Sequence, residues 1–186
     1  MLHTAATELA VSLAEAKLHL RVTANLEDAL ITSQIRAATE DAEQLMHRAV
    51  MPQKWRLALD GFPEELVLRR PPVTAVDSIQ YADPASGALA AVQPADYRLL
   101  RCDDYESIVV PAFGKTWPTH RAQRQAVEVL FSAGYATADV VPEAIKAWIK
   151  LRLGALYENR EAWTLGQKIE QNAHVDYLLD RYRGWV

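Results

Sequence analysis

The chain has 186 residues, a length typical of one or two compact domains, which excludes a large multidomain enzyme. Half of the residues are hydrophobic and 24% are charged, so the composition is that of a globular protein and not of a disordered chain. The 24 Asp and Glu residues outnumber the 20 Lys and Arg residues and give a net charge of −4, which argues against a protein that mainly grips nucleic acid phosphates. The N-terminal segment resembles neither a signal peptide nor a membrane anchor, so we expect a cytoplasmic protein.

Two helices are predicted in the first fifty residues. A capping box at Ser12 and Glu15 predicts a short helix over 13–22. Asn25 and Asp28 mark the start of a longer helix that Met51-Pro52 should end. Its apolar face repeats at spacings of three and four residues, which indicates a helix packed along one side. The residues of that face are Ile31, Ile35, Ala38, Ala42, Leu45 and Ala49.

Residues 53–140 are predicted to form a β region. Short runs of Val, Ile, Leu and aromatic residues alternate with turn residues, and such short links favour a mainly antiparallel sheet. The predicted strands are Trp55–Leu59, Leu66–Leu68, Val76–Tyr81, Tyr97–Arg101, Ser107–Val110 and Val127–Phe131. The loop over 82–95 is rich in alanine, and its role is left open.

Helical spacing returns after Val141-Pro142-Glu143 and again over 167–182. Apolar residues cover more than one face of the first of these helices, so it lies either within its own core or partly against another chain. The final helix presents the same alternatives, with aromatic enrichment of the kind found in interfaces. The candidate oligomer or partner interface consists of Ile145, Trp148, Ile149, Leu153, Leu156, Tyr157, Leu178, Leu179, Tyr182 and Trp185.

No catalytic site can be assembled from the sequence. Gly114-Lys115-Thr116 resembles the end of a phosphate-binding loop, but Val109 stands where that loop needs a glycine, so we predict an ordinary turn. The single cysteine, Cys102, cannot form an internal disulfide and is predicted to be a buried or half-buried structural thiol. The five histidines match no zinc signature. We therefore predict no catalytic residues, no cofactor and no bound metal.

An acidic run formed by Asp103, Asp104 and Glu106 supports two hypotheses. Carboxylates could bind a hard cation, which would make the chain a small α+β enzyme or binding domain with an acidic metal-binding turn. The run also lacks the glycine and the distal Glu of a calcium loop, so a solvated hairpin tip is the interpretation that we favour.

Read in order, several segments resemble the head-tail connector, or head-completion adaptor, proteins of siphovirus-type phages and prophages. Each segment is weakly diagnostic, and the specificity lies in their order along nearly the whole chain. The segments are Val11–Val22, Gln53–Pro63, Leu68–Val73, Val76–Asp83, Trp117-Pro118, Phe131–Tyr135, Val141–Ile145 and Tyr157–Glu161.

The resemblance implies an α+β fold in which helices over about 12–50 and 142–182 form a bundle and the β region is inserted between them, within one domain. It also implies a structural protein rather than an enzyme, in a ring of about a dozen copies closed by head-to-tail contacts. Such a ring sits in the virion below the portal, extends the DNA channel and offers a platform to a neck or tail-completion protein. DNA would pass through without tight binding, and no membrane partner is implied. The host cytoplasm would be the place of assembly.

The end of the chain combines Gly184, which weakens a helix, with Trp185, an apolar anchor. With the resemblance in view, we expect the residues after Arg181 to contact the portal or a neighbouring subunit.

Overall fold

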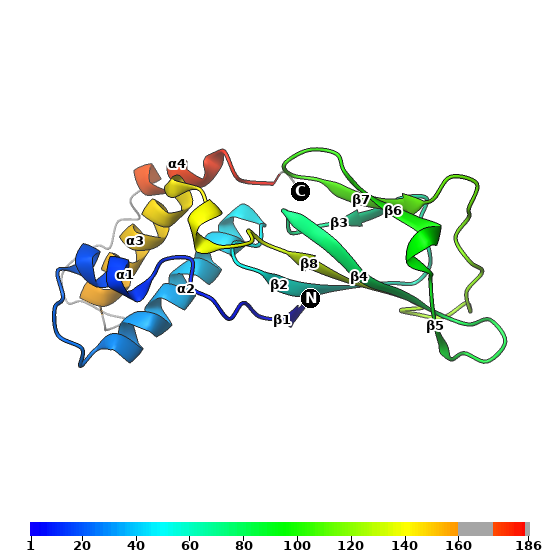
Figure 1. Cartoon of the computed structure of the whole chain (residues 1–186), viewed down its shortest axis with the longest axis horizontal. Coiled ribbons are helices and arrows are strands. Elements are labelled where there is room, and N and C mark those ends of the chain that lie inside the picture. Colours follow the sequence, from blue (N-terminus) through cyan, green and yellow to red (C-terminus); the bar gives the residue numbers. More distant parts are fainter. Residues whose placement is uncertain (160–172, 185–186) are drawn as a thin grey trace. The chain divides into compact units, whose positions relative to one another are not determined.

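The computed structural model describes residues 1–159 and 173–184, and the chain divides into two compact units. Residues 1–7 and 52–134 form the first, which we call the β unit, and residues 8–51 and 135–186 belong to the second, the helical unit. The predicted combination of helices with antiparallel strands is confirmed (Figure 1). No described helix combines the length and the apolar composition that crossing a lipid bilayer requires.

The helical unit is built around two long helices, α2 (Asp28–Met46) and α3 (Glu143–Glu158), which pack against each other. The shorter helices α1 (Leu13–Leu20) and α4 (Ala173–Asp180) each contact both of them. A 3₁₀ turn, η2 (Ala138–Val140), precedes α3.

One half of the predicted capping box is confirmed, because the Ser12 hydroxyl accepts the backbone N–H of Glu15 at the start of α1. The Glu15 carboxylate accepts from Lys150 on α3. The predicted start and end of α2 are wrong. Glu27, not Asn25, precedes its first turn. The helix ends five residues before Met51, since His47 adopts a left-handed conformation with φ 55° and its N–H bonds to the carbonyl of Glu43.

Alanines allow close packing along α2. Ile31, Ile35, Ala38 and Ala42 are fully buried, as their spacing predicts. Leu45 is an exception, because it remains 39% exposed and the next residue, Met46, fills the core instead. From α3 and α4 the core receives Ile145, Trp148, Ile149, Leu153 and Leu179.

The β unit contains two antiparallel sheets. One has five strands in the order β1-β2-β8-β4-β5, and the other has three in the order β3-β7-β6. The strands of the first are β1 (Leu2–Thr4), β2 (Gln53–Leu59), β4 (Val73–Ala82), β5 (Leu89–Ala91) and β8 (Val127–Ala133). Those of the second are β3 (Leu66–Leu68), β6 (Tyr97–Arg101) and β7 (Ser107–Pro111), with the 3₁₀ turn η1 (Pro94–Asp96) before β6.

The last strand in sequence is the central strand of the larger sheet. β8 pairs with β2 over its whole length and with β4 on its other side. Its residues alternate strictly between buried and half-buried, and Val127, Val129, Phe131 and Ala133 face the core. Arg101 links the two sheets, since its guanidinium donates to the carbonyls of Val73 (3.1 Å) and Thr74 (2.7 Å).

The alanine-rich loop contains the short strand β5, which pairs with the end of β4. Asp83 organises the turn between these strands, because its Oδ1 accepts the N–H groups of Ala85 (3.0 Å) and Ser86 (2.8 Å) and the Ser86 hydroxyl (2.9 Å).

Candidate interface and surrounding surface

The structure places five of the ten candidate interface residues inside the helical unit. Ile145, Ile149, Leu153 and Leu179 are fully buried there and Trp148 is nearly so. Their apolar character is accounted for by the core of their own unit, which separates them from any partner. The pattern of α3 therefore reflects a helix surrounded by α1, α2 and α4.

Four of the other candidates, Leu156, Tyr157, Leu178 and Tyr182, are half-buried, so part of each side chain stays accessible. Trp185 lies outside the described residues. Tyr177, which is not among the ten candidates, is the most exposed large apolar residue of α4 in the described part of the chain.

Helix α4 and the residues after it lie on their own unit. The indole N–H of Trp148 donates to Asp176 Oδ1 at 3.0 Å, and Leu179 completes the core beneath α4. Beyond the helix, the backbone N–H of Gly184 donates to the carbonyl of Met46 at 3.0 Å, at the end of α2. The chain is thus anchored on the helical unit as far as Gly184.

Polar contacts tie α3 to α1 and α2. Lys150 Nζ lies 2.7 Å from Glu15 Oε1 on α1, and Arg152 Nε lies 2.8 Å from Asp41 Oδ2 on α2. All four side chains are partly exposed, so each pair contributes about 1 kcal/mol or less. Their main effect is to fix how the helices are aligned.

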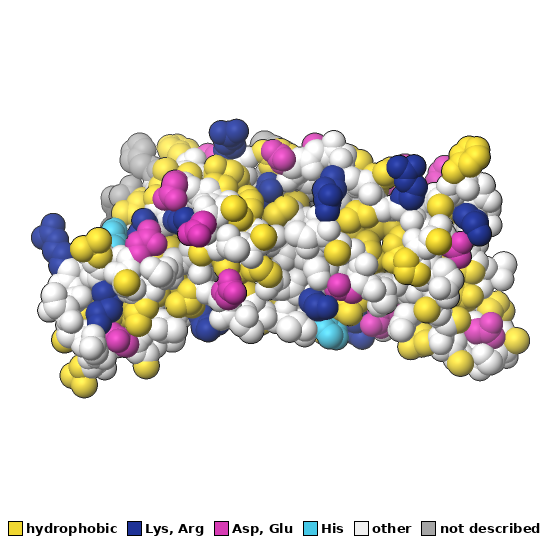
Figure 2. Space-filling view, in the orientation of Figure 1, with side chains coloured by type: hydrophobic (Ala, Val, Ile, Leu, Met, Phe, Trp, Pro, Cys, Tyr) yellow, Lys and Arg dark blue, Asp and Glu magenta, His cyan; other side chains and the backbone are white. Residues whose placement is uncertain are grey.

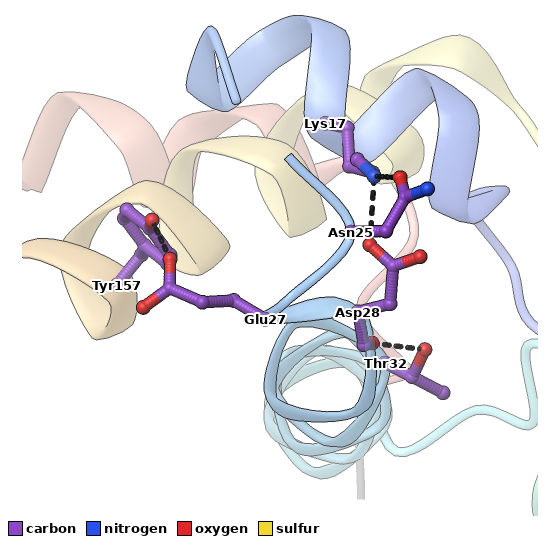
Figure 3. Close-up of polar contacts among 6 residues, drawn as sticks. All are labelled: Lys17, Asn25, Glu27, Asp28, Thr32 and Tyr157. Carbon is purple, nitrogen blue, oxygen red and sulfur yellow. Dashed lines mark hydrogen bonds and ion pairs between the residues drawn. The ribbon is translucent and has the colours of Figure 1, made fainter. Parts of the chain in front are cut away.

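The connection between α1 and α2 is held at both ends (Figure 3). Lys17 Nζ on α1 donates to Asn25 Oδ1 at 2.6 Å and lies 2.7 Å from Asp28 Oδ1. The Tyr157 hydroxyl on α3 donates to the Glu27 carboxylate. The Thr32 hydroxyl donates back to the carbonyl of Asp28 at 2.7 Å in the first turns of α2. The segment before α2 is therefore fixed to two different helices.

The motifs that suggested chemistry have structural roles. Gly114 adopts φ 73° in a tight turn closed by the Lys115 N–H on the Ala112 carbonyl, which confirms the predicted turn. The Lys115 ammonium, which a phosphate would need, pairs with Asp96 Oδ1 at 2.9 Å.

The acidic run forms the tip of the β6–β7 hairpin. Asp103 Oδ1 accepts the backbone N–H groups of Tyr105 (2.6 Å) and Glu106 (2.7 Å), so this carboxylate is already used by its own turn. Within residues 1–159 and 173–184 no three His, Cys, Asp or Glu side chains are grouped so as to hold a metal ion. Cys102 beside this tip is exposed, so the prediction of a buried or half-buried thiol is wrong. A residue at the end of an edge strand has one side open to water.

Charges are mixed on the visible face of the molecule (Figure 2). On the face shown in Figure 2, basic and acidic side chains are interspersed among apolar ones, and neither sign dominates a large area. This face therefore offers no continuous basic track for a nucleic acid backbone.

Comparisons with known proteins show which class of protein the chain resembles. The family model for the phage gp6-like head-tail connector protein matches residues 10–79. Two solved structures match over 100% of this chain, each with a TM-score of 0.79. The first is "Neck of empty GTA particle computed with C6 symmetry", which is 27% identical and is covered over 96% of that chain. The second is "Virion of native gene transfer agent (GTA) particle", which is 26% identical and is covered over 95% of that chain. A third, "Neck of native GTA particle computed with C12 symmetry", shares the fold at 24% identity, over 96% of that chain, with a TM-score of 0.75. No curated protein sequence matches the chain.

The chain is therefore similar to structural proteins of phage-like particles. More particularly, the resemblance to head-tail connector proteins is confirmed, both by the family model and by the neck proteins that share the fold.

Proposed function

We propose that the chain is the subunit of a ring in the neck of a virion, below the portal. In this position the ring extends the DNA channel and provides the platform on which a neck or tail-completion protein docks. About a dozen copies would close the ring through repeated head-to-tail contacts. The helical unit and the β unit act as one connector domain, in which the N- and C-terminal helices form a bundle that carries the β region.

The observation that carries this proposal is the match over 100% of the chain to a neck protein of a particle computed with C6 symmetry, at 27% identity and a TM-score of 0.79. A fold preserved over the full length supports a common architectural role, because both units are retained. Rotational symmetry in that particle supports several copies of this chain around one axis.

The charge of the chain suits a channel through which DNA moves. With a net charge of −4 and interspersed charges on the face seen in Figure 2, a ring of these subunits repels a polyanion weakly and binds it weakly. DNA can therefore pass through the ring without being bound tightly.

For contacts with the neck partners, the accessible candidates are the half-buried residues of α3 and α4: Leu156, Tyr157, Leu178 and Tyr182. We propose that they contribute to the partner interface, together with Trp185 at the end of the chain. The five fully or nearly buried candidates contribute indirectly, by holding these two helices together.

Native mass spectrometry of the purified protein over a range of concentrations, with and without the portal protein, tests the ring. We expect an assembly about ten times heavier than the monomer, because a closed ring has no open contacts at which growth could continue. Electron microscopy of the same sample should show a ring with a central channel. A chain that stays monomeric at high concentration, with the portal present as well as without it, contradicts the proposal.

A further inference from the structure

Three exposed leucines lie around the connection between α1 and α2, and we call them the leucine corner. Leu26, in the connection, is 94% exposed, and Leu18, on α1, is 80% exposed. They are the two most exposed leucines of the described residues. Leu30, on the first turn of α2, is 37% exposed. Full burial of a leucine side chain is worth about 1.5–3 kcal/mol, and Leu18 and Leu26 gain little of this within the chain.

The exposure of Leu26 is not a result of loose structure. The residues on either side of it are held in place, Asn25 by Lys17 and Glu27 by Tyr157, and Asp28 is held by Lys17 as well (Figure 3). The backbone is therefore ordered before any partner arrives, which reduces the conformational entropy lost on binding.

Leu26 also does not stabilise the start of α2. An apolar residue just before the N-cap often packs on the fourth helical residue, as a hydrophobic staple. Here Glu27 is the N-cap and Ile31 holds that fourth position, but Ile31 is fully buried by other contacts while Leu26 faces solvent. Its apolar character is unused within the described fold.

We propose that the leucine corner is a subunit contact, covered by a neighbouring copy of this chain. This inference rests on the proposed ring and assigns one of its two contacting surfaces. A head-to-tail contact joins two different surfaces, so the corner would meet a different part of the neighbour rather than its equivalent.

Charge favours a second copy as the occupant. Each chain carries a net charge of −4, so copies repel one another over most approaches. Within residues 17–28 the charges balance, since Lys17 and Arg21 are basic, Glu27 and Asp28 are acidic, and Lys17 pairs with Asp28. Like-charged subunits can approach this surface with little repulsion, and apolar contacts can then form.

Three variants test the proposal. Leu26→Glu adds a charge to the corner, whereas Leu26→Met keeps an apolar side chain at the same position. Leu89→Glu is the matched control, since Leu89 is a 63% exposed leucine on β5 in the β unit. Assembly is measured as the concentration at which half of the protein is in rings, by mass photometry or native mass spectrometry. The melting temperature of each variant at low concentration, where the protein is monomeric, verifies its fold.

We expect Leu26→Glu to raise the half-assembly concentration by about tenfold or more, as for a residue near the centre of an interface. Leu26→Met and Leu89→Glu should assemble like the wild type, and all melting temperatures of the monomers should agree because both positions are exposed.

If wild-type rings form and Leu26→Glu assembles equally well, the leucine corner is not a subunit contact, and the proposed ring is unaffected. The same holds if Leu26→Glu forms normal rings and fails only in binding the portal or a tail protein, because the corner then serves a different partner. If the wild type forms no ring with or without the portal, the proposed function itself fails.

Discussion

Alanine side chains decide how closely α2 can approach its neighbours. Ala38 is fully buried and Ala37, the residue before it, is exposed, so one helix offers a core position and a surface position of the same residue type. Close packing leaves no room for additional methylene groups at Ala38.

Ala38→Leu should therefore lower the free energy of unfolding by about 1–3 kcal/mol, through overpacking. At this chain length the melting temperature would fall by roughly 2–4 °C for each kcal/mol. Calorimetry measures both quantities. Ala37→Leu is the control and should change stability by less than about 0.5 kcal/mol. Equal effects of the two substitutions would show that the buried face of α2 is assigned wrongly.

The turn at Asp83 is expected to respond to pH. The backbone N–H and then the hydroxyl of Ser86 donate to this carboxylate and lower its pKa below the usual value of 3.8. Because the folded state has the lower pKa, the turn is fully stabilised above pH 3.8 and loses that stabilisation as the pH falls further, through the folded pKa. The protection of the Ser86 amide proton, measured by NMR as its exchange rate relative to the intrinsic rate at each pH, should fall over that range. Asp83→Asn keeps an acceptor without the titration, so an identical pH response in this variant would refute the assignment.

The acidic hairpin tip should not respond to metal ions. Asp103 is engaged by the N–H groups of Tyr105 and Glu106, and in the described part of the chain no three His, Cys, Asp or Glu side chains are grouped to hold a metal ion. Addition of millimolar Mg²⁺, Mn²⁺ or Ca²⁺ should leave the melting temperature unchanged, whereas specific binding at 100 times the Kd would stabilise the protein by about 2.7 kcal/mol. Replacement of Asp103, Asp104 and Glu106 by alanine should also leave particle assembly intact. A metal-dependent shift that this triple variant abolishes would revive the metal-binding hypothesis.

At the scale of elements, the sequence predicts best the segments with a repeating pattern of their own. The strands Leu66–Leu68 and Tyr97–Arg101 have the predicted bounds, and the central part of α2 is buried on the predicted face. The strands β1 and β5 were missed because each has three residues and is defined by its pairing, with β2 and β4. The end of α2 depends on the left-handed conformation of His47, and a histidine marks a helix end less clearly than a glycine does.

Residues of the chain's own core are harder to distinguish, from sequence, from residues of a partner interface. Apolar spacing on α3 indicated buried residues correctly, but the same spacing could not say whether the chain itself or a partner buries them. Leu26 was missed for the opposite reason, since it falls between two helices and belongs to no periodic pattern. Its exposure depends on how Lys17 and Tyr157 hold the connection, which only the folded chain shows.

The end of α4 allows a prediction about the last residues. The Gly184 N–H on the Met46 carbonyl and the half-buried Tyr182 attach this segment to the helical unit. Truncation after Arg181 should therefore cost about 1 kcal/mol, the net value of one hydrogen bond with its neighbouring contacts, and lower the melting temperature by a few degrees.

Truncation after Gly184 is the matched control, because it keeps those contacts and removes Trp185 and Val186 alone. We expect no change in the melting temperature of the monomer and weaker assembly or portal docking. Complete unfolding of either truncated chain would show that the segment belongs to the essential core, and the docking role would then fall.

At the scale of the whole molecule, ring formation should be visible in stability. A partner that binds only the folded state raises the apparent stability by mass action, and here the partner is the protein itself. The melting temperature of the wild type should therefore rise with protein concentration, while that of Leu26→Glu should rise less. Scanning calorimetry over a hundredfold concentration range measures this. A melting temperature independent of concentration would indicate that no ring forms under those conditions.

The position of β8 has a consequence for synthesis on the ribosome. The pairs β1–β2 and β4–β5 are complete in the nascent chain well before β8 emerges, and in the finished sheet β8 joins them. Translation proceeds at about 5–20 residues per second, so β2 waits for several seconds with an unpaired edge. Such an edge is a template for pairing with another chain. Polysomes, which hold many nascent copies side by side, are therefore where misassembly of this protein would begin, and slower translation before residue 127 would increase it.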